Sequence, residues 1–173
     1  IEAHTDELLD WDLRYDQLDC GRFEGRFTDI RCEGLQIFQE TTTRRVRQRG
    51  HLPKGSFSLG TMLAGEGSLH VNGRSVAHDT LIALHGQELD VCTPPQCTLA
   101  GMVVDASLLH SAAAGRPDLG ALLQGQTLQA VMAPAATLVA LRALLQAALA
   151  LAQRQPEALQ APGVQRHLRD GWS

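Results

Sequence analysis

The chain has 173 residues, of which 44% are apolar and 20% charged, and its mean hydropathy is −0.10. This composition excludes a disordered, fibrous, membrane-embedded or disulfide-dense protein, and the length suits one domain with or without an appendage. A formal net charge of −4 and a pI of about 5.9 argue against direct DNA binding, which requires a basic surface. Two Trp, one Tyr and four Phe are too few for a platform that stacks RNA bases.

The first 110 residues have the turn spacing of an antiparallel β protein. An amphipathic stretch over residues 6–18 predicts a short N-terminal helix, and eight apolar runs separated by turn signals follow it. Asn72-Gly73 predicts a type I′ hairpin because both residues accept a positive φ. This pattern predicts a sandwich or a barrel without choosing between them. The predicted strands are residues 22–32, 35–44, 56–63, 68–71, 74–76, 80–84, 88–92 and 97–104.

Residues 111–173 have a helical pattern rich in Ala, Leu and Gln. Asp105 or Ser107 is the predicted cap of one short helix, and Asp118 is that of another. The strongest helical prediction lies between Pro134 and Pro156, because the intervening residues are mostly Ala and Leu. Residues 157–170 begin a final predicted helix.

The long predicted helix is apolar on more than one face. Arg142 and Gln146 interrupt its apolar sequence, so we expect it not to cross a bilayer. Its main stripe favours either packing within one subunit or an antiparallel helix pair across a two-fold axis. We predict that this stripe forms a homodimer interface: Leu138, Leu141, Leu145 and Leu149.

Sequence motifs for catalysis are missing. The chain has no His-x-His pair of the kind that a mononuclear cupin enzyme uses, although His70, His78 and His85 lie on consecutive predicted strands or turns. It also lacks the Gly-x-Ser-x-Gly elbow of serine hydrolases and the Gly-Lys-Ser/Thr end of a phosphate-binding loop. We therefore expect no bound metal, no other cofactor and no enzymatic activity.

The cysteine pattern favours a reducing cytoplasm. Four cysteines form no Cys-x-x-Cys pair, and no secretory leader precedes them. Cys92 and Cys97 flank a turn, where they form either a redox-sensitive pair or, more commonly, two small members of the core. The sequence starts at Ile1 and stops at Ser173 within a predicted helix, so we expect it to be part of a longer protein.

Residues 43–49 hold four arginines in six positions. As a strand, this run places Arg45, Arg47 and Arg49 on one side. The pattern favours a solvated edge strand protected by its charge, and the alternative is a surface for another domain or an acidic ligand. Glu88 and Asp90 likewise share one side of a predicted strand, which suits a solvated edge or a contact with a cationic ligand.

Several segments along the chain match a known family: Tyr15-Asp16-Gln17-Leu18, Gly21-Arg22-Phe23-Glu24-Gly25, Leu35-Gln36-Ile37-Phe38-Gln39-Glu40-Thr41, Gly86-Gln87-Glu88-Leu89 and Gln155-Pro156-Glu157-Ala158-Leu159. In these segments the chain resembles the N-terminal regulatory domain of AraC-type transcriptional regulators, above all those of ethanolamine-utilisation operons. The resemblance spans nearly the whole chain and implies a mainly β protein with C-terminal helices: a cupin-like (jelly-roll) β-barrel that senses an effector, followed by helices for dimerisation. It also implies a DNA-binding helix-turn-helix module beyond residue 173.

The effector does not follow from the resemblance. Aromatic faces and carboxylates together hold ammonium groups, and so few aromatic residues predict that the aromatic part of such a cage is nearly absent. Specificity for ethanolamine is therefore not carried over, and no residue supports adenosylcobalamin binding. By strand position and residue type, the candidate effector contacts are Phe38, Glu40, Arg47, His70, His85, Glu88 and Met102.

We therefore expect residues 1–110 to form the sensor barrel and residues 111–173 a helical dimerisation segment of a cytoplasmic bacterial regulator. Its partners are a second copy, a small effector and, through the missing module alone, DNA; no membrane is expected. Because a signal requires different affinity for two states, the effector must contact an element that moves, such as the N-terminal segment or the barrel-to-helix junction. The alternatives are a cupin-fold enzyme for a small molecule and a ligand-free dimerisation module.

Overall fold

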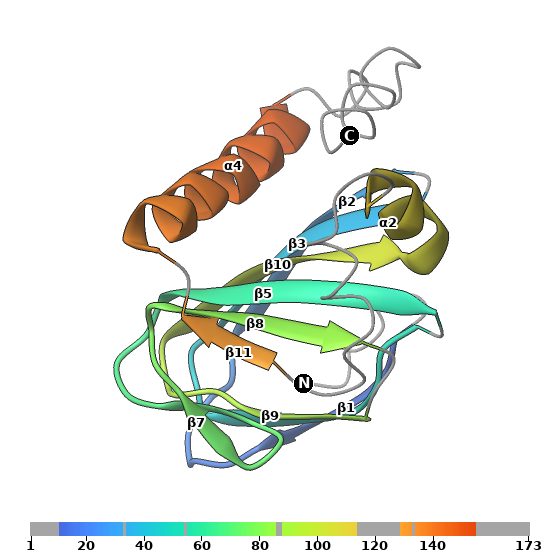
Figure 1. The fold of residues 1–173 in the computed structure, drawn as a ribbon. Coiled ribbons are helices and arrows are strands. Elements are labelled where there is room, and N and C mark those ends of the chain that lie inside the picture. The colour runs from blue at the N-terminus through green and yellow to red at the C-terminus, as the bar shows by residue number, and fades with distance from the viewer. Residues whose placement is uncertain are drawn as a thin grey trace.

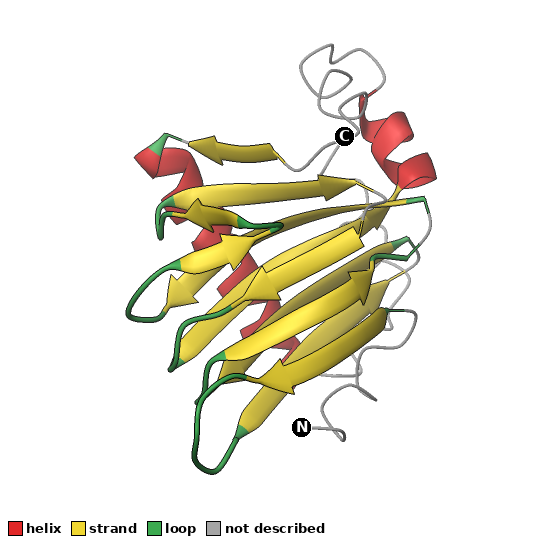
Figure 2. Cartoon of the chain, turned by 90° about the horizontal axis from the view of Figure 1, so that it is seen from below, coloured by secondary structure: helices red, strands yellow, loops and turns green. Residues whose placement is uncertain are grey.

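Two antiparallel sheets pack face to face, and a long helix lies across the outer face of the larger sheet (Figures 1 and 2). The computed structural model describes residues 11–32, 34–53, 55–85, 88–113, 129–132 and 134–154. The prediction of a mainly β fold with C-terminal helices is confirmed. The inner faces of the two sheets form a shared core.

The strands of each sheet come from distant parts of the sequence. In spatial order, the smaller sheet contains β1 (Asp12–Gln17), β4 (Val46–His51), β9 (Glu88–Cys92), β6 (Leu69–Val71) and β7 (Arg74–Val76). The larger sheet contains β11 (Gln129–Met132), β8 (Thr80–His85), β5 (Ser56–Ala64), β10 (Cys97–Asp105), β3 (Leu35–Thr42) and β2 (Gly25–Cys32). The helices are α2 (Ala106–Ala113) and α4 (Ala135–Arg154).

Most predicted elements are present at the predicted places. Each of the eight predicted runs contains a strand, and Asn72 and Gly73 have φ angles of 47° and 76°, as a type I′ turn requires. Helix α2 follows Asp105, and α4 fills the interval after Pro134. The predicted helices capped by Asp118 and over residues 157–170 lie outside the described residues.

Two stretches predicted to be helical form strands. β1 replaces part of the helix predicted over residues 6–18, because Leu13 and Tyr15 alternate with polar residues and pack into the inter-sheet core while the backbone pairs along β4. β11 lies in the segment predicted to be helical and pairs with β8. The backbone hydrogen bonds of β11 are made to β8, a strand distant in sequence, so the local pattern could not predict them.

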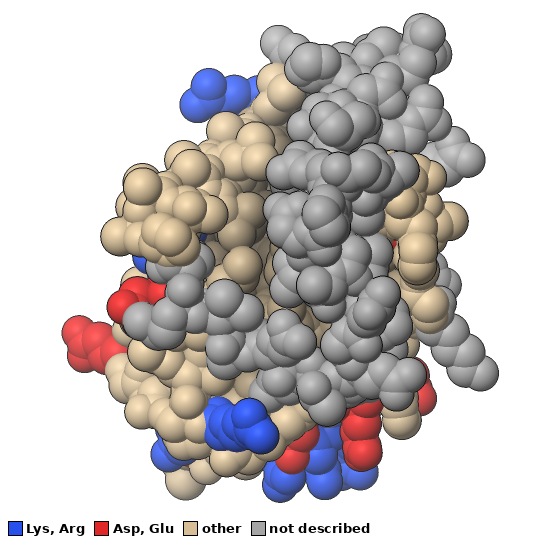
Figure 3. Space-filling model, in the orientation of Figure 1, with Lys and Arg blue, Asp and Glu red and all other residues tan. Residues whose placement is uncertain are grey.

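The arginine run is an internal strand rather than an edge. β4 pairs with β1 on one side and β9 on the other. Arg47 donates two hydrogen bonds to Asp90, at 2.8 and 2.6 Å, and Arg49 donates one to Asp16 at 2.6 Å. These bonds lower the pKa of both carboxyl groups. Charged side chains of both signs accordingly gather at the lower edge of the molecule (Figure 3).

A second core joins the larger sheet to α4. Leu145 and Leu149 pack against Ile37, Met102 and neighbouring residues of β2, β3 and β10. The assignment of Leu138, Leu141, Leu145 and Leu149 to a dimer interface is therefore wrong, because this leucine face is covered within the same chain. The sequence pattern contains two apolar faces, and only the packing shows that the sheet takes the bulkier one.

By length and composition alone, α4 is apolar enough to cross a bilayer. The prediction that Arg142 and Gln146 make the helix too polar for this is therefore not supported. Helices that pack in a protein core pass the same test. One face of α4 packs on the sheet, and Arg142 on that side donates a hydrogen bond to the Met62 carbonyl at 2.9 Å. The apolar composition of α4 therefore does not by itself indicate a membrane segment.

The two cysteines near the β9–β10 turn do not form a redox pair. All four cysteines are free thiols. Cys97 is buried in the inter-sheet core. The neighbour of Cys92, Val91, points its side chain into that core, so Cys92 points to the opposite face of β9. There it interacts electrostatically with Arg47. The alternative that they are ordinary small members of strands is the one that the structure supports.

Candidate functional site

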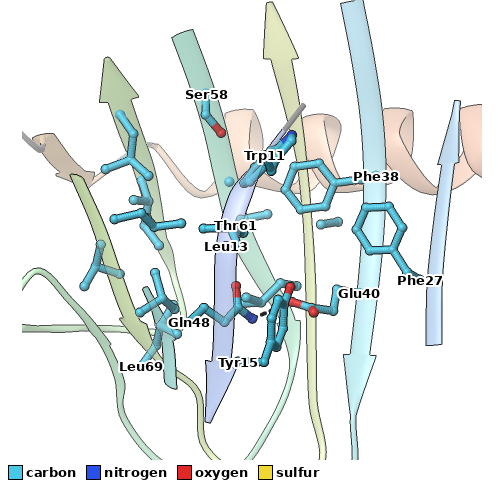
Figure 4. A pocket seen from close by; sticks show the side chains of 18 residues that line it. Trp11, Leu13, Tyr15, Phe27, Phe38, Glu40, Gln48, Ser58, Thr61 and Leu69 are labelled. Carbon is cyan, nitrogen blue, oxygen red and sulfur yellow. Dashed lines mark hydrogen bonds between the residues drawn. The ribbon is translucent and has the colours of Figure 1, made fainter. Parts of the chain in front are cut away.

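The candidate site is a cavity of about 70 Å³ between the two sheets. Both sheets supply its walls, which consist mainly of apolar side chains (Figure 4). The described lining residues are Trp11, Leu13, Tyr15, Phe27, Phe38, Glu40, Gln48, Ser58, Gly60, Thr61, Leu69, Val71, Ile82, Leu84, Leu89, Val91, Leu99 and Ala100.

Aromatic side chains gather on one wall. Trp11 meets Phe38 edge to face, with ring centroids 5.5 Å apart and planes at 79°, and Phe27 stacks on Phe38 at 5.9 Å and 15°. Trp11 Nε1 also donates a hydrogen bond to Gln36 Oε1 at 3.1 Å. With Tyr15, four of the seven aromatic residues line this one cavity. The expectation that an aromatic cage is nearly absent is therefore wrong, because a low total count says nothing about clustering.

A glycine pair makes room for this wall. Gly60 of β5 and Gly101 of β10 face each other across the ladder. A Cβ at Gly101 would lie 2.9 Å from the Phe38 ring and 2.5 Å from the Leu59 carbonyl oxygen, so only glycine fits there. A Cβ at Gly60 would meet only the Ala100 carbonyl oxygen, at 3.7 Å. The cavity therefore reaches the sheet backbone at this point.

The polar centre of the cavity consists of Tyr15, Glu40 and Gln48, all less than 8% exposed. Gln48 Nε2 donates a hydrogen bond to Glu40 Oε2 at 2.6 Å, drawn as the dashed line in Figure 4. Burial, the Glu40 charge and a hydrogen bond with its carboxylate raise the pKa of Tyr15. Burial, followed by the same charge, raises the pKa of Cys97 to about 12. Among the described lining residues, Glu40 is the one charged side chain.

Local strand geometry explains how this centre forms. On β3, Leu35 and Ile37 face α4, so Phe38 and Glu40 lie on the opposite face and line the cavity. On β4, Gln48 points inward between Arg47 and Arg49, which make ion pairs on the outer face. The period-two alternation of a strand thus separates an inward polar side chain from outward charges.

Of the six predicted effector contacts whose side chains the structure describes, two lie at the cavity. Phe38 and Glu40 line the cavity. Arg47 is held outside by Asp90, and Glu88 is exposed on the same strand as Asp90. Met102 packs beneath α4 in the second core. Residue type and strand position did not establish which face each side chain occupies, and these three side chains lie away from the cavity.

Of the two predicted histidines, His70 does not extend the site. His70 lies between Leu69 and Val71, which both line the cavity, so its side chain points to the opposite face of β6. His85 ends β8, and its side chain lies outside the described part of the structure. Among the described residues, no three His, Cys, Asp or Glu side chains come together as metal ligands.

Sequence reasoning missed Trp11, Tyr15 and Gln48. The first two fell in a predicted helix, so their alternation as part of a strand was not used. Gln48 lies in the arginine run, which was interpreted only by the side that its arginines share. Reading residues 46–51 strictly at period two would have identified it.

No family model matches this sequence. Among solved structures, the AraC-like transcriptional activator CuxR matches with a TM-score of 0.56 and 16% sequence identity, over 97% of this chain and 61% of that protein. This chain and CuxR therefore share a fold. The resemblance to AraC-type regulators is thus confirmed at the level of the AraC-like fold, and the chain spans about three fifths of the length of CuxR.

Two further similarities are weaker. The EutQ protein of Clostridium difficile matches with a TM-score of 0.37 and 12% identity, over 57% of this chain and 98% of that one. A predicted oxalate decarboxylase of Thermotoga maritima matches with a TM-score of 0.25 and 16% identity, over 47% and 93% of the two chains. Both scores are too low to add an argument to the AraC-like fold.

Proposed function

We propose that this chain is the effector-sensing and dimerisation domain of an AraC-type transcriptional regulator, with a cupin-like barrel that binds its effector between the two sheets. The observation that carries the proposal is the apolar cavity around the buried Glu40 carboxylate, in a fold shared with a transcriptional activator. Because the chain spans about three fifths of CuxR, DNA binding in this proposal belongs to a further part of the protein. The proposed protein is bacterial and cytoplasmic, and has no enzymatic role.

The cavity indicates the chemistry of the effector. Its volume of about 70 Å³ is roughly half that of an engineered cavity of about 150 Å³ that holds benzene, so the enclosed part of the effector has only a few heavy atoms. Glu40 suits a cationic or hydrogen-bond-donating head group, and the Trp11 and Phe38 rings suit its apolar body or its charge. A compact primary amine combines these properties, and an anion is disfavoured by the Glu40 charge.

The test uses three small probes of similar shape: propylamine, 1-propanol and propionate. We expect millimolar propylamine to raise the melting temperature and to shift NMR resonances of cavity residues, with a weaker effect of the alcohol and none of the acid. Glu40→Gln keeps the side-chain shape and should abolish the amine effect. Glu88→Gln makes the same chemical change on an exposed strand position and should leave it intact. If none of the three probes has an effect, the sensor proposal is contradicted.

We assign dimerisation to the face of α4 that the sheet leaves uncovered. Val139, Leu144 and Leu151 are 64, 49 and 45% exposed, the largest exposed apolar side chains of this helix. Small exposed residues, Ala140, Ala143 and Ala147, lie between them and permit close approach of a second helix. Figure 3 shows that the visible surface over α4 is almost free of charged side chains.

The dimer assignment is tested by charge on this face. Leu144→Glu together with Leu151→Glu should give a folded monomer, measured by light scattering after size exclusion, because two buried carboxylates per protomer would oppose association. Gln153→Glu adds a charge to another exposed position of the same helix and should leave the dimer intact. A dimer that survives the double substitution would refute the assignment.

A further inference from the structure

Strand β5 supplies Ser58, Gly60 and Thr61 to the cavity wall, and this part of the wall is called the floor of the cavity. Arg142 connects α4 to this strand. Its Nη2 donates hydrogen bonds to the Met62 carbonyl at 2.9 Å and to Thr61 Oγ1 at 3.3 Å, both on β5. The same nitrogen donates to the carbonyl of His78, in the turn before β8. One guanidinium therefore holds the N-terminal half of α4 against β5 and the β7–β8 turn.

The sheet separates the cavity from α4 by a single pair of residues at this point. Thr61 and Ala100 are direct partners across the β5–β10 ladder. Both border the cavity, yet Thr61 also accepts the hydrogen bond from Arg142, and Ala100 also belongs to the apolar cluster beneath α4. The adjacent Gly60–Gly101 pair has no side chains, so a group in the cavity touches the β5 backbone itself.

The Arg142 contact is poised to respond to small movements of β5. Among the described residues, no carboxylate pairs with the guanidinium, and its buried Nε has no hydrogen-bond partner. The partners of this partly buried cation are the three oxygens named above and the His78 ring nitrogen Nδ1, at 3.4 Å. Such a cation gains little net stability, because these contacts must offset its lost hydration. A small shift of Thr61 or Met62 therefore changes the balance that holds this end of the helix.

We infer that Arg142 is a positioning residue that couples the floor of the cavity to α4. A group that presses on β5 at Gly60 displaces the Thr61 hydroxyl and the Met62 carbonyl, which alters how firmly Arg142 holds α4 on the sheet. The C-terminal half of the helix keeps its leucine contacts during this change. This coupling goes beyond the proposed effector, because it depends on the shape of the floor and not on what fills the cavity.

The coupling has one competing route through the fold. β11 directly precedes α4 and pairs with β8, whose Ile82 and Leu84 also line the cavity. Movement of β8 would reach α4 through the backbone without involving Arg142. A useful experiment must therefore compare the same disturbance of the floor with and without the Arg142 contact.

The test is hydrogen–deuterium exchange of peptides from residues 135–154, with Gly60→Ala as the disturbance in place of an effector. The added methyl group is accommodated, since its nearest neighbour is 3.7 Å away. Arg142→Met keeps an apolar stem and should raise α4 exchange at least threefold, whereas Arg154→Met at the exposed end of the same helix should not. Gly60→Ala should change α4 exchange at least twofold in the native background and not in the Arg142→Met background.

Three results would overturn the inference. One is equal exchange in the Arg142→Met and Arg154→Met variants; another is an unchanged α4 after Gly60→Ala. The third is the same change after Gly60→Ala in both backgrounds, which would assign the coupling to β11 and β8. If Arg142→Met does not fold, Thr61→Val removes only the accepting hydroxyl and should give the same loss of coupling. No ligand is used, so failure here is distinct from failure of the sensor proposal.

Discussion

The two faces of the larger sheet are buried in different ways. Toward α4, Leu145, Leu149 and Met102 fill the interface with apolar side chains. Toward the smaller sheet, the same strands leave a cavity and bury Glu40 with Gln48. A cavity and a buried carboxylate both lower stability relative to a filled apolar core. The difference supports the proposal that the inter-sheet face binds an effector, whereas the α4 face contributes packing.

The largest expected effect concerns the supporting face. Leu145→Ala should destabilise the protein by about 2–5 kcal/mol, because Leu145 is 1% exposed and its removal leaves a cavity under α4. The measurement is urea unfolding followed by circular dichroism. Leu18→Ala makes the same change at a 47% exposed position outside the proposed dimer face and should cost less than about 0.5 kcal/mol. Similar losses in both variants would mean that α4 does not rest on the sheet through this face.

The second effect concerns the inter-sheet face. Glu40→Leu should cost about 1–3 kcal/mol, because the buried Gln48 amide and the buried Tyr15 hydroxyl both lose their hydrogen bonds to Glu40. Adding Gln48→Leu should recover part of this loss, since it removes the buried Gln48 amide while the Tyr15 hydroxyl stays without its bond to Glu40. The same unfolding assay measures both steps. If the double variant is less stable than Glu40→Leu alone, the polar centre contributes to stability rather than to binding.

The outer face of the smaller sheet gives a third comparison, because its carboxylates are paired with arginines whereas Glu40 lies inside. The hydrogen bond from Arg47 lowers the pKa of Asp90, so the folded protein binds this proton less readily than the unfolded chain. The resulting stabilisation is complete above the unfolded value of about 4 and is lost as pH falls through the lower folded value. Urea midpoints at several pH values measure it.

Asp90→Asn removes this contribution to stability. The gap in urea midpoint between the native protein and this variant should be largest near pH 7 and should close in strong acid. Glu88→Gln alters an exposed carboxylate two residues away and serves as the control. A gap that widens toward low pH would contradict the lowered pKa of Asp90.

The smallest effect distinguishes inner from outer thiols. Burial and the Glu40 charge raise the pKa of Cys97 to about 12, so few thiolates form at pH 8, whereas Cys20 is exposed. In a reaction with a disulfide reagent, Cys20→Ser should remove the fastest phase, and Cys97→Ser should leave it unchanged. Loss of the fast phase in Cys97→Ser would show that the inter-sheet core opens readily.

Local sequence patterns predicted the elements well where the backbone itself carries the signal. Asn72-Gly73 accepts two positive φ angles, and the Pro134–Pro156 interval is bounded by residues that begin or interrupt helices. Such signals depend on the neighbouring few residues only. The same logic failed at β1, where an alternation compatible with a strand was interpreted as a helical stripe, because its pairing partner β4 lies some 30 residues further along the chain.

The sequence by itself determined the class of fold and the place of its turns and long helix, because φ preferences and hydrophobic periodicity are local. Only the tertiary structure decided which side chains meet. It gathered Trp11, Tyr15, Phe38 and Glu40 around one cavity, from strands far apart in sequence. It turned Arg47 outward to Asp90 and placed the leucine face of α4 on the sheet. Those choices depend on strand order and on competition between faces, which no short stretch of sequence contains.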